Sequence, residues 1–301
     1  MTGYSGTMER VRVRASATSA NLGAGFDVLG LALDEPYDVI EVEPAERLEI
    51  RIVGKGAGSI PLDPEKNTAG LVAKAMGRDV LITIHSNIRP SGGLGSSAAP
   101  AAGTAFAINE LFSLGYTREG LVPIAAKGEV AAAGVAHADN VGPCIMGGLT
   151  IVCGDHAKSV AMPDVSVVAI LPDIEVSTKA ARELLPACVP LREMVLNVGK
   201  ACMLVAGASS KDPAMIGRSL MGSFNEKYRS PLIKGYEDVR AGALSQGAYG
   251  VAISGSGPTM IALCPGERSK HVEKAMIGQF GKHGISCESF ITRVGQGVQI
   301  I

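Results

Sequence analysis

Residues 89–99 read Arg-Pro-Ser-Gly-Gly-Leu-Gly-Ser-Ser-Ala-Ala, and this glycine-rich segment is the most informative part of the sequence. It follows the alternating apolar run 80–84, which predicts a strand with one buried face. It precedes the Ala-, Leu- and Phe-rich segment 98–112, which predicts a packed helix. Glycine lets a backbone approach a phosphate closely, and the free N–H groups of a first helical turn point at the anion. We therefore predict a phosphate-binding loop between a strand and a helix.

An ordinary capped loop is the alternative interpretation, because serine and glycine favour helix caps and turns for their own reasons. The compact run Gly-Gly-Leu-Gly-Ser-Ser-Ala-Ala, residues 92–99, is more specific than a lone Gly-x-Gly and favours phosphate binding. It is neither a Gly-Lys-Ser/Thr P-loop nor a Rossmann fingerprint, since no lysine follows the glycines and their spacing differs. The sequence therefore indicates a nucleotide-phosphate loop of another kind.

Length and composition narrow the class of protein. A chain of 301 residues favours two domains over one. The net charge of −1 and the lack of long basic runs argue against nucleic acid as a partner, and no apolar stretch is long enough to span a membrane. The polar N-terminus lacks a signal-peptide core and leaves open whether Met1 or Met8 is the natural start. Six cysteines without Cys-x-x-Cys pairing predict buried thiols of a cytoplasmic protein.

Periodicity along the chain predicts an α+β fold in two parts, which we divide into residues 1–160 and 161–301. Strands are expected at 11–15, 39–42, 48–53, 80–84, 149–153, 165–171, 250–253, 260–264 and 288–293. Helices are expected at 68–76, 98–112, 120–133, 178–185, 191–206, 213–220, 233–245 and 269–280.

Two further segments carry residues that chemistry could use. Residues 16–27, Ser-Ala-Thr-Ser-Ala-Asn-Leu-Gly-Ala-Gly-Phe-Asp, place an amide (Asn21) and a carboxylate (Asp27) in a glycine-bounded loop, although a simple turn would explain them too. Glu129 lies in an alanine-rich helical stretch in which Lys127 is the other charge. A carboxylate there must be paired, solvated or bound to a metal, and beside a nucleotide Mg²⁺ is the natural partner.

The remaining candidates lie further along the chain. His137-Ala138-Asp139-Asn140 is a polar group that fits a ligand site and a polar helix end equally well. Residues 251–259, Val-Ala-Ile-Ser-Gly-Ser-Gly-Pro-Thr, either form an ordinary hairpin turn or provide a second backbone loop that packs on the phosphate loop. Arg182 and Arg229 are ordinary surface arginines unless a shared anionic ligand joins them.

Taken together and in this order, these segments resemble the small-molecule kinases of the galactokinase, homoserine kinase, mevalonate kinase and phosphomevalonate kinase (GHMP) superfamily. The three superfamily motifs correspond to residues 16–27, 90–99 and 250–259, so the resemblance spans nearly the whole chain. Within the superfamily, the segments that look like homoserine kinases are 17–33, 137–141, 177–182 and 228–229.

The resemblance implies a fold and an activity. The expected fold has an N-terminal domain like domain 2 of ribosomal protein S5, which binds ATP, and a ferredoxin-like C-terminal domain, with the active site between them. The implied reaction is the ATP-dependent phosphorylation of the side-chain hydroxyl of L-homoserine, a step of threonine biosynthesis. The expected partners are these small molecules, with no nucleic acid or membrane, and the resemblance leaves open whether the chain forms a homodimer.

The resemblance also implies roles for individual residues. Arginines can pair with an α-carboxylate, and carboxylates can accept from an α-amino group. Because an amide cannot accept a proton, Asn140 would orient the substrate hydroxyl with Arg182 assisting, while the proton passes to the γ-phosphate. The implied nucleotide contacts are Asn67, Pro90, Ser91, Gly92, Gly93, Leu94, Gly95, Ser96 and Ser97; the implied Mg²⁺ ligands are Ser97 and Glu129; the implied substrate contacts are Asn21, Asp27, His137, Asp139, Thr178 and Arg229.

Two departures and two alternatives accompany this interpretation. The loop has two residues between Pro90 and Gly93 where many homoserine kinases have three, and the segment before Arg229 lacks the proline common there. A mevalonate or archaeal-type shikimate kinase would keep the ATP residues, but an acidic pocket suits an amino group that those substrates lack. A catalytically inactive, ligand-binding homologue is the other alternative, against which the intact Ser97 and Glu129 argue.

Overall fold

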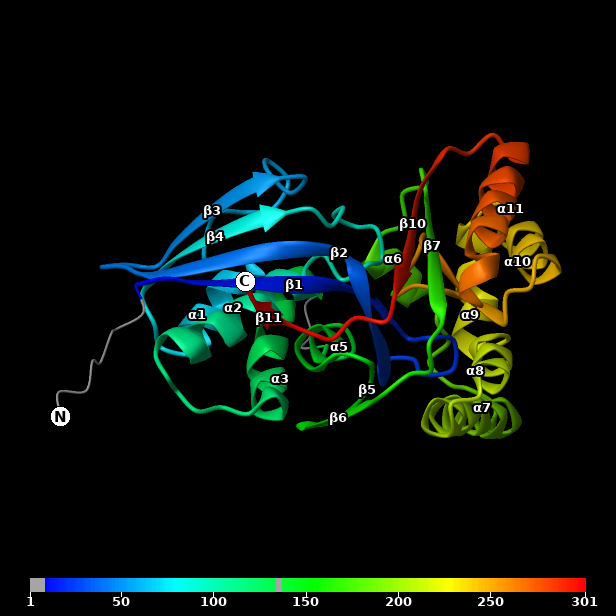
Figure 1. Ribbon diagram of the computed structural model, residues 1–301, viewed down its shortest axis with the longest axis horizontal. Helices are drawn as coiled ribbons and strands as arrows, with labels where there is room; N and C mark the ends of the chain where they lie inside the picture. Colours follow the sequence, from blue (N-terminus) through cyan, green and yellow to red (C-terminus); the bar gives the residue numbers. More distant parts are fainter. Residues whose placement is uncertain (1–8, 134–136) are drawn as a thin grey trace.

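The computed structural model describes residues 9–133 and 137–301. The chain forms two α/β parts that lie side by side, with the N-terminal sheet in one part and a smaller sheet in the other (Figure 1). The first sheet has seven strands in the order β11-β1-β2-β4-β3, with β5 beside β2 and β6 beside β5. Its strands are β1 (Val11–Ala20), β2 (Leu29–Pro44), β3 (Glu49–Gly54), β4 (Val80–Ser86), β5 (Leu149–Cys153), β6 (His156–Val160) and β11 (Gln299–Ile300).

The strand directions in this sheet bring two distant loops together. β2 pairs antiparallel with β1 on one side and with β4 on the other, so β1 and β4 run in the same direction. Their carboxyl ends, Ala20 and Ser86, therefore point toward the same edge of the sheet. The loops that follow, 21–28 and 87–97, are the ones that the sequence singles out. The topology thus places both beside the second part of the molecule.

Helices α1 (Thr68–Ala75), α2 (Ala98–Leu111), α3 (Arg118–Ala126) and α5 (Val141–Met146) cover one face of the first sheet (Figure 1). The central helix, α2, is apolar on nearly all sides and almost fully buried, as expected for a helix enclosed by other elements. Its small residues allow close packing, because a Cβ at Gly103 would lie 2.5 Å from Ile40 of β2. This close approach packs the middle of α2 against β2.

The second sheet is antiparallel, with the order β10-β7-β9-β8. Alternate residues of β7 face opposite sides: Val168 and Ile170 pack under α10 and α11, whereas Val167 and Ala169 join the larger core with α7 and α8. The β-α-β-β-α-β path through this sheet is the expected ferredoxin-like pattern. Its elements are β7 (Ser166–Pro172), α6 (Thr178–Glu183), α7 (Leu191–Ser210), α8 (Pro213–Leu220), α9 (Phe224–Arg229), α10 (Tyr236–Ser245), β8 (Gly250–Ile253), β9 (Met260–Cys264), α11 (Ser269–Lys282) and β10 (Cys287–Arg293).

Several elements differ from the sequence predictions. The helix expected at 120–133 changes to a tight 3₁₀ turn at Lys127–Glu129 before α4 (Val130–Ala133). Strand β6 and helices α5 and α9, each five or six residues long, were not expected from the sequence. The last strand, β11, pairs with β1, so the chain end lies on the first sheet although the division at residue 160 assigns it to the second part.

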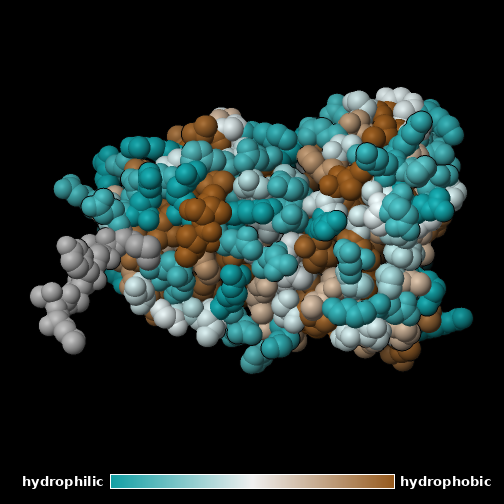
Figure 2. Space-filling model, in the orientation of Figure 1, coloured by the Kyte–Doolittle hydropathy of each residue, from teal (hydrophilic) through white to brown (hydrophobic). Residues whose placement is uncertain are grey.

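The surface of the face shown in Figure 2 is largely hydrophilic, with separate apolar patches. None of the helices in the described ranges is long and apolar enough to cross a membrane. All six cysteines carry free thiols, as predicted. The prediction that they are buried is wrong for three of them, which are exposed: Cys153 at the end of β5, Cys188 in the loop before α7, and Cys202 on α7.

Candidate active site

The phosphate loop begins at a buried carboxylate. Asp38 on β2 is 0 % exposed, and its Oδ1 accepts the backbone N–H groups of Asn87 at 2.7 Å and Ile88 at 2.9 Å. These are the first residues after β4, so Asp38 fixes the direction in which the loop leaves the sheet. Further along, Gly93 and Gly95 adopt positive φ angles of 78° and 70°, which glycine tolerates best.

A second loop, residues 254–259, holds the phosphate loop from the other part of the molecule. The Ser254 hydroxyl donates to the carbonyl of Gly93 at 2.6 Å, and the Thr259 hydroxyl donates to the carbonyl of Gly92 at 2.6 Å. A Cβ at Gly93 would lie 2.5 Å from the Ser254 carbonyl oxygen, so the two backbones approach too closely for any side chain there. The interpretation of 251–259 as a loop that packs on the phosphate loop is confirmed.

The start of α2 presents free donors to the space above the loop. Within the described chain, the backbone N–H groups of Gly95, Ser96 and Ser97 donate to no protein acceptor. Ser97 occupies the N-cap position, where a serine side chain ordinarily accepts from the first turn, yet it makes no such bond. Its hydroxyl instead donates to Glu129 Oε2 at 3.0 Å. The serine is thus aimed at a carboxylate rather than used as a cap.

Glu129 is a buried carboxylate with one unused oxygen. It is 5 % exposed, and its Oε1 has no hydrogen-bond partner among the described atoms. Burial raises its pKa from 4.5 to about 7, against the lowering effect of the hydrogen bond from Ser97. No group of three or more His, Cys, Asp or Glu side chains in the described segments is arranged to hold a metal. A cation here would therefore need further ligands from a bound nucleotide, as Mg²⁺ typically does.

The loop after β1 carries the second cluster of polar side chains. Asn21, at φ 71°, accepts the backbone N–H of Asp27 at 3.0 Å through Oδ1 and donates to the carbonyl of Gly255 at 2.8 Å through Nδ2. Asn197 of α7 donates to the carbonyl of Ala24 at 2.8 Å. The start and the middle of the loop are therefore held by residues of the second part of the molecule.

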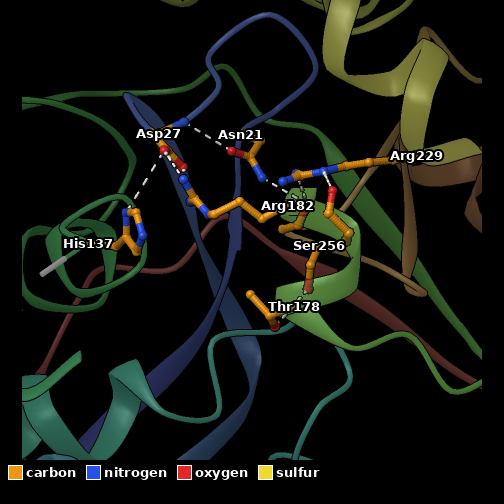
Figure 3. Close-up of polar contacts among 9 residues, drawn as sticks. Asn21, Asp27, His137, Thr178, Arg182, Arg229 and Ser256 are labelled. Carbon is orange, nitrogen blue, oxygen red and sulfur yellow. Dashed lines mark hydrogen bonds and ion pairs between the residues drawn. The ribbon is translucent and has the colours of Figure 1, made fainter. Parts of the chain in front are cut away.

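Asp27 and Arg182 form a two-bond ion pair across the site (Figure 3). The guanidinium of Arg182, on α6, donates to the two carboxylate oxygens of Asp27 at 3.0 and 2.9 Å. His137 lies on the far side of Asp27, with Nδ1 4.0 Å from Oδ2. Burial lowers the pKa of His137, with Asp27 acting in the opposite direction. Burial therefore favours the neutral form of the ring.

A second arginine lies beside this pair. Arg229 of α9 is 3 % exposed and donates to the carbonyl oxygens of Ala181 at 3.3 Å and Gly255 at 3.2 Å. Burial lowers the pKa of Arg229, and the neighbouring charge of Arg182 lowers it further. Thr178, at the start of α6, lies 3.2 Å from the hydroxyl of Ser256 (Figure 3). The site therefore holds two cationic groups within reach of one ligand.

Asp139 and Asn140 complete the cluster. Asp139 is 4 % exposed, and burial raises its pKa to about 7, with a further rise caused by the charge of Asp27. Asn140 Oδ1 accepts from the hydroxyl of Thr18 at 2.8 Å. This bond fixes the orientation of the amide and leaves Nδ2 directed away from Thr18, free to donate.

These groups line one pocket of about 220 Å³ between the two parts. Larger hollows of about 430 and 580 Å³ exist elsewhere, but they contain none of the predicted site residues. The pocket does not include Asn67, whose side chain caps α1 by accepting from Ala69 at 2.9 Å and donating to the Pro61 carbonyl at 2.7 Å. Pro90, Gly92 and Leu94 are also outside it. The pocket is lined by Ala20, Asn21, Asp27, Ser91, Gly93, Gly95, Ser96, Ser97, Glu129, His137, Asp139, Asn140, Thr178, Arg182, Arg229, Gly255 and Ser256.

Three residues that support the site were not singled out from the sequence. Thr18 is fully buried in β1 and looks like any strand threonine. Ser256 lies within the second glycine-serine loop, but nothing local marks its contact with α6. The ring of Phe26 lies under both arginines, 5.4 Å from the guanidinium carbon of Arg182 and 4.9 Å from that of Arg229. Only its position beside Asp27 could have signalled a role.

Comparison with known proteins gives matches over the whole chain. Residues 66–148 match the family model GHMP kinases N terminal domain, and residues 204–283 match GHMP kinases C terminal. A homoserine kinase of Methanocella arvoryzae is 65 % identical over 294 residues, which cover 98 % of each chain. The crystal structure of a homoserine kinase from Cytophaga hutchinsonii superposes with a TM-score of 0.90 at 35 % identity and covers both chains fully.

A structure of a mevalonate kinase from L. major matches with a TM-score of 0.73 at 17 % identity, covering 98 % of this chain and 97 % of that one. At that identity the likeness shows the fold alone, whereas the homoserine kinases match in sequence as well. Membership of one family therefore explains both the two-domain α+β fold and the motifs around residues 21, 97, 129 and 255. The chain belongs to the GHMP kinase superfamily and, within it, to the homoserine kinases.

Proposed function

We propose that this protein transfers the γ-phosphoryl group of ATP to the side-chain hydroxyl of L-homoserine. The observation that carries the proposal is the ion pair between Asp27 and Arg182, which lies in the same pocket as the free N–H groups of the phosphate loop. One side of the pocket suits a polyphosphate, and the other suits a small molecule that carries both a positive and a negative charge. A homoserine kinase with 65 % identity is consistent with this assignment.

The phosphate side acts through the backbone. The N–H groups of residues 95–97 and the positive end of the α2 dipole favour an anion at the start of that helix. Ser254 and Thr259 hold the loop carbonyls and so keep its N–H groups pointing toward the pocket. This pre-formed arrangement neutralises phosphate charge without reorganisation during transfer.

The carboxylate of Glu129 and the hydroxyl of Ser97 fit a magnesium ion. The oxygen Oε1 of Glu129 is buried without a donor, so in the absence of a cation its charge is uncompensated. Mg²⁺ prefers one or two carboxylates together with phosphate oxygens, which matches a single acidic residue beside a nucleotide loop. When bound, the ion would screen the charge that develops on the transferring phosphoryl group.

The amino-acid side of the pocket works by exchanging partners. In the structure, the guanidinium of Arg182 pairs with the carboxylate of Asp27. An incoming α-ammonium group would replace the guanidinium at Asp27, while the α-carboxylate would pair with the freed Arg182 and with Arg229. Asp139, buried nearby with a raised pKa, offers a second acceptor for the ammonium group. A molecule with only one of the two charges would leave one protein group unpaired.

Transfer itself needs alignment more than covalent chemistry. Asn140 Nδ2 would donate to the substrate hydroxyl oxygen and direct its lone pair at the γ-phosphorus, since Oδ1 is already held by Thr18. A new O–P bond forms as the bond to the leaving ADP oxygen breaks and takes its electron pair. Because an amide cannot take up a proton, the hydroxyl proton passes to the phosphoryl group.

A coupled assay of ADP release with ATP and Mg²⁺ tests this function. Purified protein would be given L-homoserine, mevalonate or shikimate in separate reactions, with a reaction that lacks any acceptor as the control. We expect turnover with homoserine only. Turnover of mevalonate or shikimate in place of homoserine would contradict the proposal, and no turnover with any acceptor would indicate an inactive homologue.

A further inference from the structure

Phe26 connects the two arginines of the site through its aromatic ring. It comes from the loop after β1 in the first part of the molecule, whereas Arg182 and Arg229 come from α6 and α9 in the second. Its ring centroid lies 5.4 Å and 4.9 Å from their guanidinium carbons. Both distances lie within the range at which a cation is attracted to the face of an aromatic ring.

The two arginines need such support because they carry like charges at close range. The charge of Arg182 lowers the pKa of Arg229, which shows that each guanidinium is repelled by the other. Asp27 forms its ion pair with Arg182, and the charges of Asp27 and Asp139 act on Arg229 without a direct contact. The hydrogen-bond partners of Arg229 among the described residues are the uncharged carbonyl oxygens of Ala181 and Gly255. An aromatic ring within reach of both cations offsets part of this repulsion without taking up the hydrogen bonds that a ligand needs.

The ring is itself held in place from the second part of the molecule. The side chain of Phe224, on the same helix as Arg229, contacts Phe26 edge-on with a centroid distance of 6.0 Å and an interplanar angle of 72°. The backbone of the Phe26 loop is fixed by the bond from Asn197 to the Ala24 carbonyl. Phe26 is half-buried, so its ring lies against the arginines rather than in open solvent.

We propose that Phe26 is a positioning residue for the substrate: its ring holds the guanidinium groups of Arg182 and Arg229 side by side, so that one α-carboxylate contacts both. This inference rests on the proposed function, since it assumes that the ligand at the arginines is the carboxylate of L-homoserine. The described partners of the ring are Arg182, Arg229 and Phe224, which belong to neither the phosphate loop nor the Glu129 segment. Its removal should therefore affect amino-acid binding and leave nucleotide binding intact.

The test compares Phe26→Leu and Phe26→Tyr with the unchanged protein in steady-state assays with ATP, Mg²⁺ and L-homoserine. Leucine removes the ring but keeps an apolar side chain, and tyrosine restores the ring. The matched control is Phe112→Leu, since the ring of Phe112 also lies under a guanidinium, that of Arg78 at 4.7 Å, but far from the pocket. Thermal unfolding of each variant is measured alongside.

We expect Phe26→Leu to raise KM for homoserine about tenfold or more, as the loss of two cation–ring contacts implies. The values of kcat and of KM for ATP should stay within about twofold, because the ring supports two arginines that would bind homoserine and not the nucleotide. Phe26→Tyr should restore most of the affinity, and Phe112→Leu should leave KM for homoserine unchanged.

Three results would overturn the inference. The first is a KM for homoserine in Phe26→Leu within twofold of that of the unchanged protein, and the second is an equal rise of this KM in Phe112→Leu. The third is a fall in kcat together with a rise in KM for both homoserine and ATP. A failure of the proposed function is distinguishable, because the unchanged protein would then not phosphorylate homoserine at all. If Phe26→Leu does not fold, Phe26→Met replaces it, since methionine also removes the ring and keeps an apolar side chain. A rise in KM for homoserine of about tenfold in that variant supports the inference, and a KM within twofold of the original contradicts it.

Discussion

Asp38 gives a quantitative test of how the phosphate loop is supported. Its carboxylate is 0 % exposed and accepts two backbone N–H groups at the start of the loop through Oδ1. Its other oxygen, Oδ2, has no partner in the described chain. Burial raises the pKa of Asp38 from 3.8 to about 6, against the lowering effect of the bonds from Ile88 and Asn87. The folded protein therefore holds this proton more tightly than the unfolded chain does.

The sign of the effect on stability follows directly. A carboxyl group whose pKa is higher in the folded state costs stability once it is ionised, so the free energy of unfolding falls as pH rises through the window between 3.8 and about 6. A shift of about two pKa units corresponds to about 3 kcal/mol for the complete titration. About 2 kcal/mol of that change falls between about pH 4.5 and about pH 7.5.

Asp38→Asn removes the charge and keeps an oxygen that can accept both N–H groups. We expect the difference in unfolding free energy between variant and original to move in favour of the variant by about 2 kcal/mol from pH 4.5 to pH 7.5. Any fixed cost of burying the amide cancels in this difference. Urea unfolding at a series of pH values measures this difference in free energy. The control is Glu46→Gln, which removes one negative charge from an exposed position. Parallel pH curves for Asp38→Asn and the original would refute the reasoning.

Three other substitutions test single contacts in the site. Glu129→Gln should lower kcat by about a hundredfold or more, since it removes the proposed metal-binding charge; an unchanged kcat at any Mg²⁺ concentration would exclude that role. Thr259→Val removes the 2.6 Å hydrogen bond to the Gly92 carbonyl and should lower the free energy of unfolding in urea by about 1–2 kcal/mol. It should also raise KM for ATP and leave KM for homoserine constant. An unchanged free energy of unfolding would show that the bond contributes nothing. Asn140→Ala should lower kcat at saturating substrates by about tenfold or more, and unchanged turnover would show that the amide does not orient the hydroxyl.

Local sequence signals predicted much of the fold. The alternation in 80–84 and the glycines of 92–95 placed β4, the phosphate loop and α2 within a few residues, because strand, turn and helix there each follow from local patterns. Elements whose existence depends on distant partners were missed. Strand β11 has two residues and forms only by pairing with β1. Helix α9 is short, although Ser223 and Glu226 carry the spacing of a capping box that could have indicated it.

The site was predicted in part for the same reason. Asn21 and Asp27 were noted as polar groups in a glycine-bounded loop and His137 as part of a polar segment, whereas Arg182 was assigned to the site only through the resemblance to the GHMP kinases. The fold brings all four to one pocket. The roles assigned to them, and to Glu129 and Ser97, stay predictions until they are measured. Asn67 was named only as a nucleotide contact implied by the resemblance. In the structure its Oδ1 caps α1, its Nδ2 donates to the Pro61 carbonyl, and the residue lies outside the pocket. Sequence cannot distinguish a capping amide from a ligand-binding one, since both are polar residues before a helix.

The most direct test of the central claim measures whether the pocket requires both charges of its substrate. Rates of ATP-dependent phosphorylation would be compared for L-homoserine, 4-hydroxybutanoate, which lacks the amino group, and 3-aminopropan-1-ol, which lacks the carboxylate. Since each analogue leaves Asp27 or Arg182 with an unpaired charge, we predict that kcat/KM falls by about a thousandfold or more for both. Similar kcat/KM values for homoserine and either analogue would contradict the account.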